Sequence, residues 1–446
     1  MTTGGSSRRT IGTVSARFAA ALDWLYSFSD MERGVGWNTR SSPGLDWNLR
    51  RTRVLLDLAG APDRGMRCVL VAGTKGKGST SAMLARILSV GGVRAGLYTK
   101  PHLQTYRERL RVDGVAIGER AFADLVDDLR PHVRELRRRV PAAGAPTTFE
   151  LTTVLALMHF ARRRCTVAVI EVGLGGRYDA TNAVDPHVSV LTPISHDHTR
   201  ELGTRLRDIA AEKSGILRPG RVVIVAPQTS EARRVLLAAC ARTAAEPREP
   251  RPLSAAQASR RGLRLHGAHQ RVNAAVALAA ADALAEHGVP LARRARVFLG
   301  LRWPGRFEVL PGEPTVVLDG AHNDGSSQAL ARALRDVFPR RRIRFVLGMM
   351  KDKDARAVIG PLIPLAAAIE ATCAPGMRAL APTAIARLVR GVAVRTHDDP
   401  ADAIHTARAQ ARPNEVVCVT GSLALVGRAR ELLGMPIVER LWDAKR

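Results

Sequence analysis

The stretch GTKGKGST, residues 73–80, directly follows the apolar run CVLVA and is the segment that decides the fold. It has the glycines, the lysine and the hydroxyls of a phosphate-binding loop, yet it departs twice from the common pattern G-x-x-x-x-G-K-[ST]. Only two residues separate its first two glycines, and Lys77 is followed by Gly78 rather than by Ser or Thr. The stretch is therefore either a phosphate cradle of another design or a flexible basic turn.

The residues around this loop favour the phosphate cradle. A β-rich run, a glycine-rich turn and a helical pattern follow one another, and backbone N–H groups at a helix N-terminus attract anions. Lys77 can reach the outer phosphates of a nucleotide, while a hydroxyl at Ser79 or Thr80 can bind Mg²⁺. The chain has only seven lysines, and two of them, Lys75 and Lys77, fall in this loop.

Composition places the chain among soluble globular proteins. Its 446 residues are 46% hydrophobic and 24% charged, which is enough for two or three domains. No run approaches the ~20 apolar residues of a membrane span, and the N-terminus lacks the apolar core of a secretion signal. The five cysteines are far apart and form no C-x-x-C pair, as in a protein with free thiols. We expect a cytoplasmic protein that does not contact a membrane.

The formal net charge of +27 raises the possibility of a nucleic-acid partner. Sixty-one of the 68 basic residues are arginines spread along the whole chain, and the 4% of aromatic residues leave little for stacking bases. This pattern is typical of a coding bias that replaces lysine by arginine, so we expect no nucleic-acid partner. The few lysines that are kept become candidates for chemistry that a guanidinium cannot do.

Apolar, β-rich runs alternate with helical patterns over most of the chain. Short continuous runs separated by helices are typical of a parallel sheet that is covered on both faces. Residues 246–261 are rich in Pro, Arg and Ser and are expected to form a surface loop. In the first part of the chain, strands are expected near residues 68–74, 166–174, 187–194 and 222–227, and helices near 119–139, 147–164 and 269–288.

Trp, Pro and Gly cluster in the stretch RWPGRFEVLPGEP and indicate a break in the chain near residue 302. Beyond it the alternation of strands and helices starts again. We therefore predict a first α/β domain with a mostly parallel sheet and an N-terminal extension over residues 1–301. A smaller, Rossmann-like α/β domain is predicted over residues 302–446. Its helices are expected over residues 326–337, 354–368 and 382–390, with one more at the end.

Polar side chains follow several of the predicted strands of the first domain. Glu171 ends the run TVAVIEV, and the next run ends in SHDHT, with His196, Asp197 and His198. Ligands of parallel α/β sheets bind beyond the carboxyl ends of the strands, so these side chains are expected on one rim. Lys213 lies near the end of a predicted helix, where arginine would serve equally well for a favourable charge.

The second domain has a similar set of polar residues. Asp319, His322 and Asn323 end the run TVVLDGAHN, and Lys351 and Lys353 lie just past another predicted strand. Six of the seven lysines thus lie at strand ends, in glycine loops or at one helix end. This placement indicates a binding site that uses both domains.

Ten stretches in this order resemble the Mur ligase superfamily and, within it, the folylpolyglutamate synthase/dihydrofolate synthase family. Together they run from about Leu22 to the C-terminus, and three of them, EVGLGGR-x-DATN, WPGRFE and LDGAHN, are specific. The ten are GTKGKGS, LYTKPHLQTYRERLRVDG, EVGLGGRYDATN, ISHDHTRELG, IAAEKSGIL, GAHQRVNAAVA, WPGRFEVL, LDGAHN, GMMKDKD and VTGSLALVG.

The resemblance implies a P-loop Mur-ligase-type ATPase domain followed by a Rossmann-like ligase domain, and it implies roles for individual residues. Residues that would bind ATP are Gly73, Thr74, Gly76, Lys77, Gly78, Ser79, Thr80, Asn273, Arg306, Asp319 and His322. Residues that would hold Mg²⁺ are Ser79, Glu171, His198 and a carbamylated Lys213. Lys77, Lys213, His198 and Arg306 would be catalytic, and Lys100 and Asp179 would contact the substrate.

The implied reaction is ATP-dependent amide formation. A pteroate or folyl carboxylate attacks the γ-phosphate to give an acyl phosphate and ADP, and the amine of L-glutamate then displaces phosphate. The expected partners are these small molecules, and the protein is expected to be a monomer. Two alternatives stay open. One is a related ligase with a different carboxylate acceptor, although a cell-wall Mur ligase carries a further domain for which 67 residues before Cys68 are too few. The other is a basic nucleic-acid-binding protein with a vestigial nucleotide fold.

Two lysines depart from the family's pattern. Lys75 stands where the family usually has Asn, and Lys100 stands where it usually has Ser. Both changes insert the rare residue into loops that are expected to flank the substrate cleft. Our hypothesis is that Lys75 and Lys100 meet an extra carboxylate or phosphate and alter the preference for the acceptor.

Overall fold

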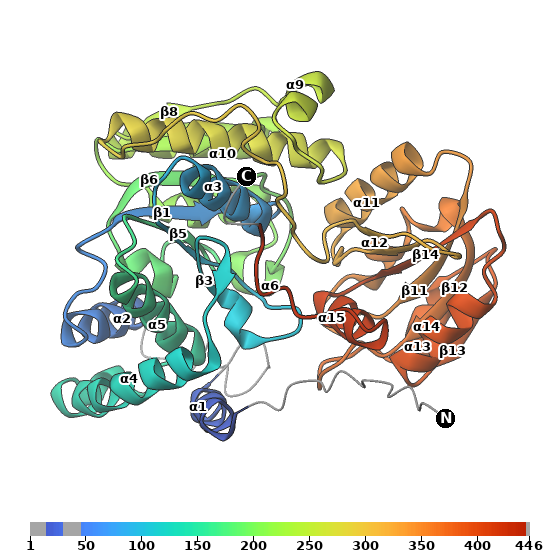
Figure 1. Cartoon of the computed structure of the whole chain (residues 1–446), viewed down its shortest axis with the longest axis horizontal. Helices are drawn as coiled ribbons and strands as arrows, with labels where there is room; N and C mark the ends of the chain where they lie inside the picture. Colours follow the sequence, from blue (N-terminus) through green and yellow to red (C-terminus); the bar gives the residue numbers. More distant parts are fainter. Residues whose placement is uncertain (1–14, 30–45, 443–446) are drawn as a thin grey trace, which may run out of the picture.

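The strand that precedes the glycine-rich loop, β1, lies inside an eight-stranded sheet (Figure 1). The computed structural model describes residues 15–29 and 46–442. The expectations for the first 14 residues and for Lys445 lie outside these ranges. In spatial order the strands are β4, β3, β2, β5, β1, β6, β7 and β8. Their bounds are β1 (Arg67–Ala72), β2 (Ala95–Tyr98), β3 (Leu110–Val112), β4 (Val115–Ala116), β5 (Val167–Glu171), β6 (Pro186–Leu191), β7 (Val222–Val225) and β8 (Glu246–Arg248).

The six strands β2, β5, β1, β6, β7 and β8 run parallel. At one edge β3 and β4 extend the sheet with antiparallel pairs. This confirms the mostly parallel sheet. The helices of this part are α1 (Ala16–Tyr26), α2 (Asp46–Leu58), α3 (Lys77–Val90), α4 (Glu119–Arg139), α5 (Thr148–Arg162), α6 (Thr199–Leu202), α7 (Leu206–Lys213), α8 (Ser230–Thr243), α9 (Ala255–Arg260) and α10 (Ala268–Glu286). Short 3-10 turns are η1 (Tyr106–Arg109), η2 (Pro141–Ala143), η3 (Ala180–Ala183) and η4 (Ser214–Ile216).

Two apolar cores cover the two faces of this sheet. Alternate residues of β1 point to opposite sides, so Val69 and Val71 pack against α3 and α10 while Leu70 packs against α1, α2, α4 and α5. The same alternation in β2, β5 and β6 makes every central strand apolar on both faces, as buried parallel strands require. The carboxyl ends of these strands meet at one edge, which faces the second domain (Figure 1).

The second domain is a six-stranded sheet in the order β13, β12, β11, β14, β10 and β9, with only β9 antiparallel. Its strands are β9 (Glu308–Leu310), β10 (Val316–Leu318), β11 (Arg342–Leu347), β12 (Ala366–Thr372), β13 (Val394–His397) and β14 (Glu415–Thr420). Its helices are α11 (Asp324–Val337), α12 (Ala355–Ile359), α13 (Pro382–Leu388), α14 (Pro400–Ala409) and α15 (Leu423–Leu432), with the 3-10 turn η5 (Ile363–Leu365). Helices α11, α12 and α13 cover one face of the sheet, and α14 and α15 cover the other.

Three expectations from the sequence differ from the structure. The helix expected over residues 354–368 is wrong beyond Ile359, because Gly360 and Pro361 end α12 and the chain enters β12 at Ala366. The stretch 246–261 is not only loop, since it contains the edge strand β8 and the helix α9. Further helices and strands that the sequence did not predict are α1, α2, α6, α14, β3, β4, β9 and β13.

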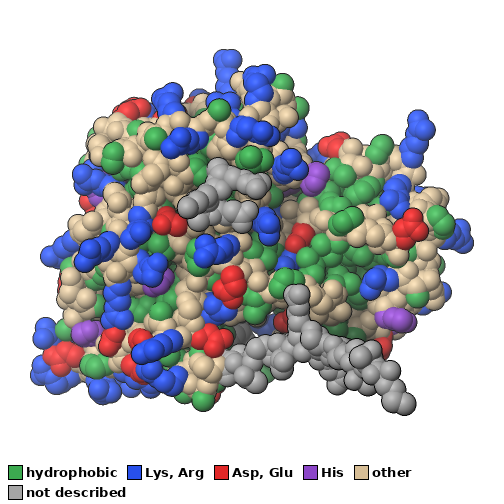
Figure 2. Space-filling model, viewed as in Figure 1, with side chains coloured by type: hydrophobic (Ala, Val, Ile, Leu, Met, Phe, Trp, Pro, Cys, Tyr) green, Lys and Arg blue, Asp and Glu red, His purple; other side chains and the backbone are tan. Residues whose placement is uncertain are grey.

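Basic side chains are spread over both domains on the face that Figure 2 shows, and acidic side chains lie among them. All five cysteines are free, as expected. Within the part of the chain that the structure describes, no helix combines the length and the apolar character that crossing a membrane requires.

The end of the described chain returns from the second domain to the first (Figure 1). These residues, 435–442, are called the C-terminal strap. Glu439 accepts a backbone hydrogen bond from Ala116 over 2.9 Å, and Leu441 accepts one from Arg302, in the linker between the domains, over 2.8 Å. The strap thus joins the two domains a second time, and the division of the chain at residue 302 stays a prediction.

Trp442 anchors the strap in the core between the first sheet and α3. Its side chain is 2% exposed, and a Cβ at Gly114 would lie 2.6 Å from the indole ring. The guanidinium of Arg86 lies 5.8 Å from the centre of the same ring, within the range of a cation–π contact.

Replacing Trp442 by alanine is expected to lower the free energy of unfolding by about 3–5 kcal/mol, because it leaves a cavity in the core between the first sheet and α3. Urea unfolding followed by circular dichroism measures this change. Ile437→Ala is the matched control, since Ile437 lies in the same strap but is 39% exposed, and its effect should stay within about 0.5 kcal/mol. Equal effects of the two variants would contradict a strap that is anchored by Trp442.

Candidate functional site

The glycine-rich loop lies between the end of β1 and the start of α3. Thr74 fixes it to the segment after β6 through two hydrogen bonds: its hydroxyl donates to Ser195 O over 3.0 Å, and Ser195 N donates to the same hydroxyl over 3.1 Å. The backbone N–H groups of Thr74 and Lys75 both donate to Pro193 O. The loop is therefore held against the segment that follows β6, directly before α3 begins.

Two glycines of the loop cannot carry a side chain. Gly76 has φ +81°, and a Cβ there would lie 2.3 Å from Oδ1 of Asn273 on α10. A Cβ at Gly73 would lie 1.9 Å from the hydroxyl oxygen of Thr192 on the neighbouring strand end. The loop is thus a tight, ordered turn in contact with α10 and the end of β6, and the flexible basic turn is excluded. The nucleotide-site candidate Asn273 donates to Gln270 and is buried against this turn.

Lys77 and Glu171 lie together beneath the loop. The Lys77 ammonium donates to Gly73 O over 3.2 Å, and burial lowers the pKa of Lys77 while Glu171 opposes this shift. Burial raises the pKa of Glu171, and Lys77 opposes that shift. Glu171 Oε2 accepts a hydrogen bond from Lys100 N over 3.2 Å. The Lys100 ammonium lies 5.7 Å from the centre of the Phe149 ring.

The SHDHT segment divides its three polar residues between solvent and cleft. His196 is exposed, whereas Asp197 and His198 are partly buried at the domain interface. His198 has φ +51°, an uncommon backbone conformation for a residue other than glycine. Burial lowers the pKa of His198 to about 3, although Asp197 opposes the shift, so the imidazole is neutral at pH 7. A neutral imidazole keeps a lone pair for a metal ion.

Lys213 ends α7 and is 5% exposed. Burial and the neighbouring charge of Lys77 lower the pKa of Lys213 to about 7, although Asp197 opposes the shift. Among the described residues no carboxylate forms an ion pair with Lys213. A substantial fraction of the amine is therefore neutral at physiological pH, and a neutral amine is a nucleophile.

The second domain presents Asp319, Arg306 and His322 to the same cleft. Asp319 accepts hydrogen bonds from Phe307 N over 2.8 Å and Ala321 N over 2.9 Å. Burial raises the pKa of Asp319, and Arg306 opposes this shift. His322 Nδ1 donates to Gly320 O over 2.8 Å, because a carbonyl can only accept, so Nε2 of the neutral ring is left as the acceptor. Burial lowers the pKa of His322.

Asp197 connects the two domains directly. Its carboxylate accepts from Lys353 Nζ over 3.0 Å and from Asn323 Nδ2 over 2.9 Å. Burial opposes ionisation of Asp197, but Lys353 and His198 hold its pKa well below the usual range. The sequence predicted each of these residues at a strand end but not their contact across the cleft.

Lys75 also reaches across to the second domain. A Cβ at Gly325, in the first turn of α11, would nearly coincide with Lys75 Nζ. Burial lowers the pKa of Lys75, and Asp324 and Asp197 oppose this shift. Lys75 therefore contacts the start of α11.

Of four other predicted residues, Ser79, Thr80 and Asp179 are buried and Gly78 is half-buried. Ser79 is 5% exposed, and the Thr80 hydroxyl oxygen is buried without a hydrogen-bond partner among the described residues. Gly78 is in contact with Trp303 of the linker, since a Cβ there would lie 3.2 Å from the indole. Asp179 accepts from Leu174 N over 2.8 Å and from Thr181 N over 3.0 Å, so its carboxylate orders the EVGLGGRYDATN segment.

The predicted metal ligands fit a divalent cation chemically. Glu171 supplies a buried carboxylate, the kind of oxygen ligand that divalent cations prefer, and His198 supplies a neutral imidazole. Within residues 15–29 and 46–442, no three His, Cys, Asp or Glu side chains gather at one point. The donor set would therefore depend on the Ser79 hydroxyl and on a modified Lys213, which are of other residue types.

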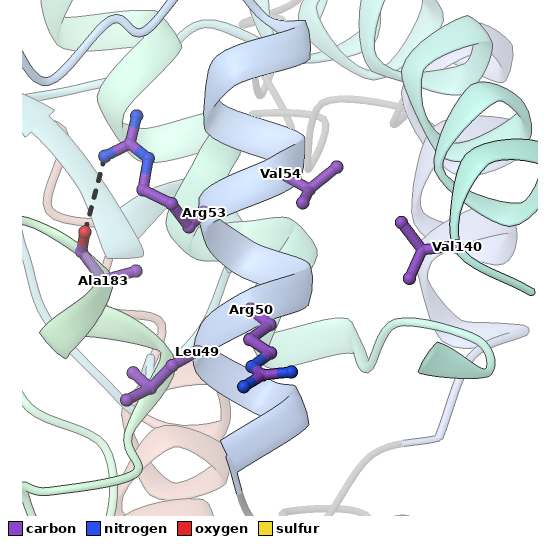
Figure 3. Close-up of a pocket in the computed structure, with 6 residues that line it drawn as sticks. All are labelled: Leu49, Arg50, Arg53, Val54, Val140 and Ala183. Carbon is purple, nitrogen blue, oxygen red and sulfur yellow. Dashed lines mark hydrogen bonds between the residues drawn. The ribbon is translucent and has the colours of Figure 1, made fainter. Parts of the chain in front are cut away.

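A shallow pocket of about 550 Å³ lies on α2, away from these residues (Figure 3). Arg53 donates to Ala183 O across it and forms ion pairs with Asp57 and Asp63. None of the predicted site residues lines this pocket. It is lined by Leu49, Arg50, Arg53, Val54, Val140 and Ala183.

Comparison with known proteins identifies the family. Residues 71–242 match the family model of the Mur ligase middle domain, and residues 305–423 match that of the Mur ligase, glutamate ligase domain. The chain is 32% identical to the dihydrofolate synthase/folylpolyglutamate synthase of Bacillus subtilis (strain 168), and the alignment covers 87% of this chain and 96% of that protein.

Solved structures agree with this assignment. A structure of Mycobacterium tuberculosis folylpolyglutamate synthase complexed with ADP has a TM-score of 0.83 and 31% identity, and covers 94% of this chain and 99% of that one. The bifunctional folylpolyglutamate synthase/dihydrofolate synthase of Yersinia pestis, complexed with AMPPNP and a Mn ion, has a TM-score of 0.77 and 25% identity over 95% of this chain and 100% of that one. The predicted fold class is confirmed, and the chain belongs to the folylpolyglutamate synthase/dihydrofolate synthase family of Mur ligases.

Proposed function

We propose that this protein is an ATP-dependent ligase that adds L-glutamate to dihydropteroate, to reduced folates, or to both. The observation that carries the proposal is the convergence of Lys77, Glu171 and Lys213 at a buried strand end that faces Arg306 and Asp319 across the domain cleft. A phosphate-binding loop on one domain and a second set of charges on the other are what a two-substrate phosphoryl transfer needs.

The loop residues are proposed to bind the phosphates of ATP. The N–H groups at the start of α3 point to an anion, and Lys77 neutralises charge on the outer phosphates. Asn273, Asp319 and His322 would complete the nucleotide site, and Arg306 would reach the γ-phosphate. Eleven residues are proposed to bind the nucleotide. The three glycines among them have no side chain and so let the phosphates come close to the backbone N–H groups of the loop. The solved M. tuberculosis structure is a complex with ADP, and we propose that this chain binds a nucleotide as well.

Ser79, Glu171, His198 and Lys213 are the residues proposed to hold Mg²⁺. A bound divalent cation would neutralise charge on the phosphates during transfer. Lys213 would enter as a carbamate: its neutral amine attacks CO₂, forms an N–C bond and releases one proton, which leaves a carboxylate-like anion. A pKa of about 7 supplies the neutral amine that this step needs. An arginine at this position could not take part.

The reaction follows from these roles. The acceptor carboxylate attacks the γ-phosphate, ADP leaves, and an acyl phosphate is formed. The α-amine of glutamate then attacks the acyl carbon, loses a proton, and phosphate leaves. Lys77 and Arg306 stabilise the negative charge that develops on the phosphoryl oxygens, and Lys100 and Asp179 are proposed at the acceptor side. We further propose a monomeric protein of the cytoplasm that has small-molecule substrates and no nucleic-acid partner.

The proposed activity predicts ADP release that depends on both L-glutamate and an acceptor. The measurement is a coupled ADP assay with dihydropteroate, tetrahydrofolate and other cofactor carboxylates. Lys77→Ala should lower kcat/KM by about 10²–10³-fold, because it removes a donor to the transferred phosphate. Activity with none of the folate acceptors would overturn the folate assignment, and full activity of Lys77→Ala would overturn the role of the loop. Salt-dependent binding of DNA or RNA without ADP release would favour the nucleic-acid alternative.

The role of Lys213 predicts chemical rescue. Lys213→Ala should lower kcat by about 10²-fold or more, and formate or acetate at millimolar concentration should restore part of the activity by supplying the missing carboxylate. Lys213→Arg is the matched control, since it fills the site with a permanent cation and should not be rescued. The kinetics are measured together with ADP binding by calorimetry. Rescue of both variants, or of neither, would argue against a carbamate at this position.

Lys100 predicts a change in acceptor preference, because its ammonium lies near Glu171 and above the Phe149 ring. In Lys100→Ser the ratio of kcat/KM values between acceptors of different charge should change by about tenfold or more, with the KM for ATP little altered. Lys75→Asn tests the other lysine of the hypothesis, which contacts the start of α11, and the two variants together show which lysine changes the acceptor preference. Identical kinetics of Lys100→Ser and the unchanged protein for every acceptor would rule out this role.

A further inference from the structure

Residues 100–109, here called the bridging loop, connect the buried site of the first domain to the second domain. At its start, Lys100 N donates to Glu171 Oε2 over 3.2 Å. Further along, the Glu108 carboxylate accepts from the backbone N–H groups of Leu103, Gln104 and Thr105 at 2.9–3.1 Å. These bonds give the loop a defined internal shape, so a displacement of its tip would be transmitted toward Lys100.

The tip of the bridging loop is pressed against helix α15 of the second domain. A Cβ at Gly427 of α15 would lie 2.1 Å from Leu103 O, so the helix has room for the loop only because residue 427 has no side chain. Gly305 of the linker approaches the same leucine, since a Cβ there would lie 3.2 Å from its side chain. Glycine is a poor residue for the middle of a helix, and here the close approach of Leu103 accounts for it.

One buried guanidinium holds this contact together. Arg430 of α15 is 2% exposed and donates from Nε to Gln104 Oε1 over 2.9 Å and from Nη2 to Pro436 O over 3.1 Å. Its Nη1 forms an ion pair with Glu308, which also accepts from Gly305 N over 3.0 Å. Gln104 Nε2 in turn donates to Met435 O over 3.2 Å. Arg430 therefore joins the bridging loop, the linker, the C-terminal strap and α15 at one point.

We propose that Arg430 and Gly427 are positioning residues for the reaction: they seat the bridging loop against α15 and thereby set the place of Lys100 and Glu171 in the site. The arrangement makes the acceptor side of the site depend on the docked position of the second domain. Neither residue touches the reacting atoms. The inference rests on the proposed function for the identity of the acceptor, but the docking itself is a separate and measurable property.

A positioning role and a purely structural role predict different measurements. If the cluster only stabilised the fold, its variants would lower the melting temperature and would leave the kinetic constants of the folded protein unchanged. If it positions the loop, folded variants should lose kcat/KM for the acceptor while the Kd for ADP changes much less, because the glycine-rich loop proposed to bind the phosphates is anchored on the segment after β6 and not on α15.

The experiment compares Gly427→Ala, Gln104→Ala and Arg430→Met with Arg428→Met in the full-length protein. Arg428 lies on the same helix but is 43% exposed and, among the described residues, pairs only with Glu431, so its variant should behave like the unchanged protein. In the three test variants, hydrogen exchange of amides 103–105 should rise at least tenfold and kcat/KM for the acceptor should fall at least tenfold. The Kd for ADP should change by less than twofold. Gly427→Ala and Gln104→Ala decide the question if Arg430→Met does not fold.

Unchanged exchange of these amides in Gly427→Ala and Gln104→Ala would overturn the docking, and faster exchange with unchanged kcat/KM would overturn the positioning role. A protein that releases no ADP with any acceptor would instead overturn the proposed function, and amide exchange would still decide the docking. The two failures are therefore distinguishable.

Discussion

The pair of hydrogen bonds between Thr74 and Ser195 is the constraint on which the cleft depends. It joins the glycine-rich loop after β1 to the segment after β6, and that segment continues into Asp197 and His198. Because Thr192 leaves no room for a side chain at residue 73, the turn can take only a narrow range of positions. The loop, the interdomain carboxylate and the buried imidazole are therefore set by one local geometry at the rim of the sheet.

The chain prefers arginine, yet three of its seven lysines are buried or half-buried at this rim. Burial shifts the pKa of Lys75, Lys77 and Lys213 downward, so each amine is easier to deprotonate than a surface lysine. A guanidinium stays charged in the same place, and a buried cation without an anion is costly. The carboxylates of Glu171, Asp324 and Asp197 oppose part of this shift for Lys75 and Lys77.

Much of the fold was predictable because long apolar runs dominate the central strands. The runs that end at Glu171 and before Asp197 could be assigned from composition alone, and with them the rim that carries the candidate ligands. The edge strand β13 was not found because it is short and half exposed, and the extent of α12 was misjudged because the apolar residues continue past Gly360 into a strand. The contacts of Asp197 with Lys353 and of Arg430 with Gln104 could not be predicted, since they join residues 156 and 326 positions apart and exist only after the domains dock.

The C-terminal strap has a consequence for how the protein is made. Domains generally fold as units while the ribosome is still at work, the N-terminal one first. Here a nascent chain that has already produced all eight strands of the first sheet still lacks Trp442, which fills the space beside Gly114 and Arg86. The first domain can therefore reach its final packing only after the second domain has been translated.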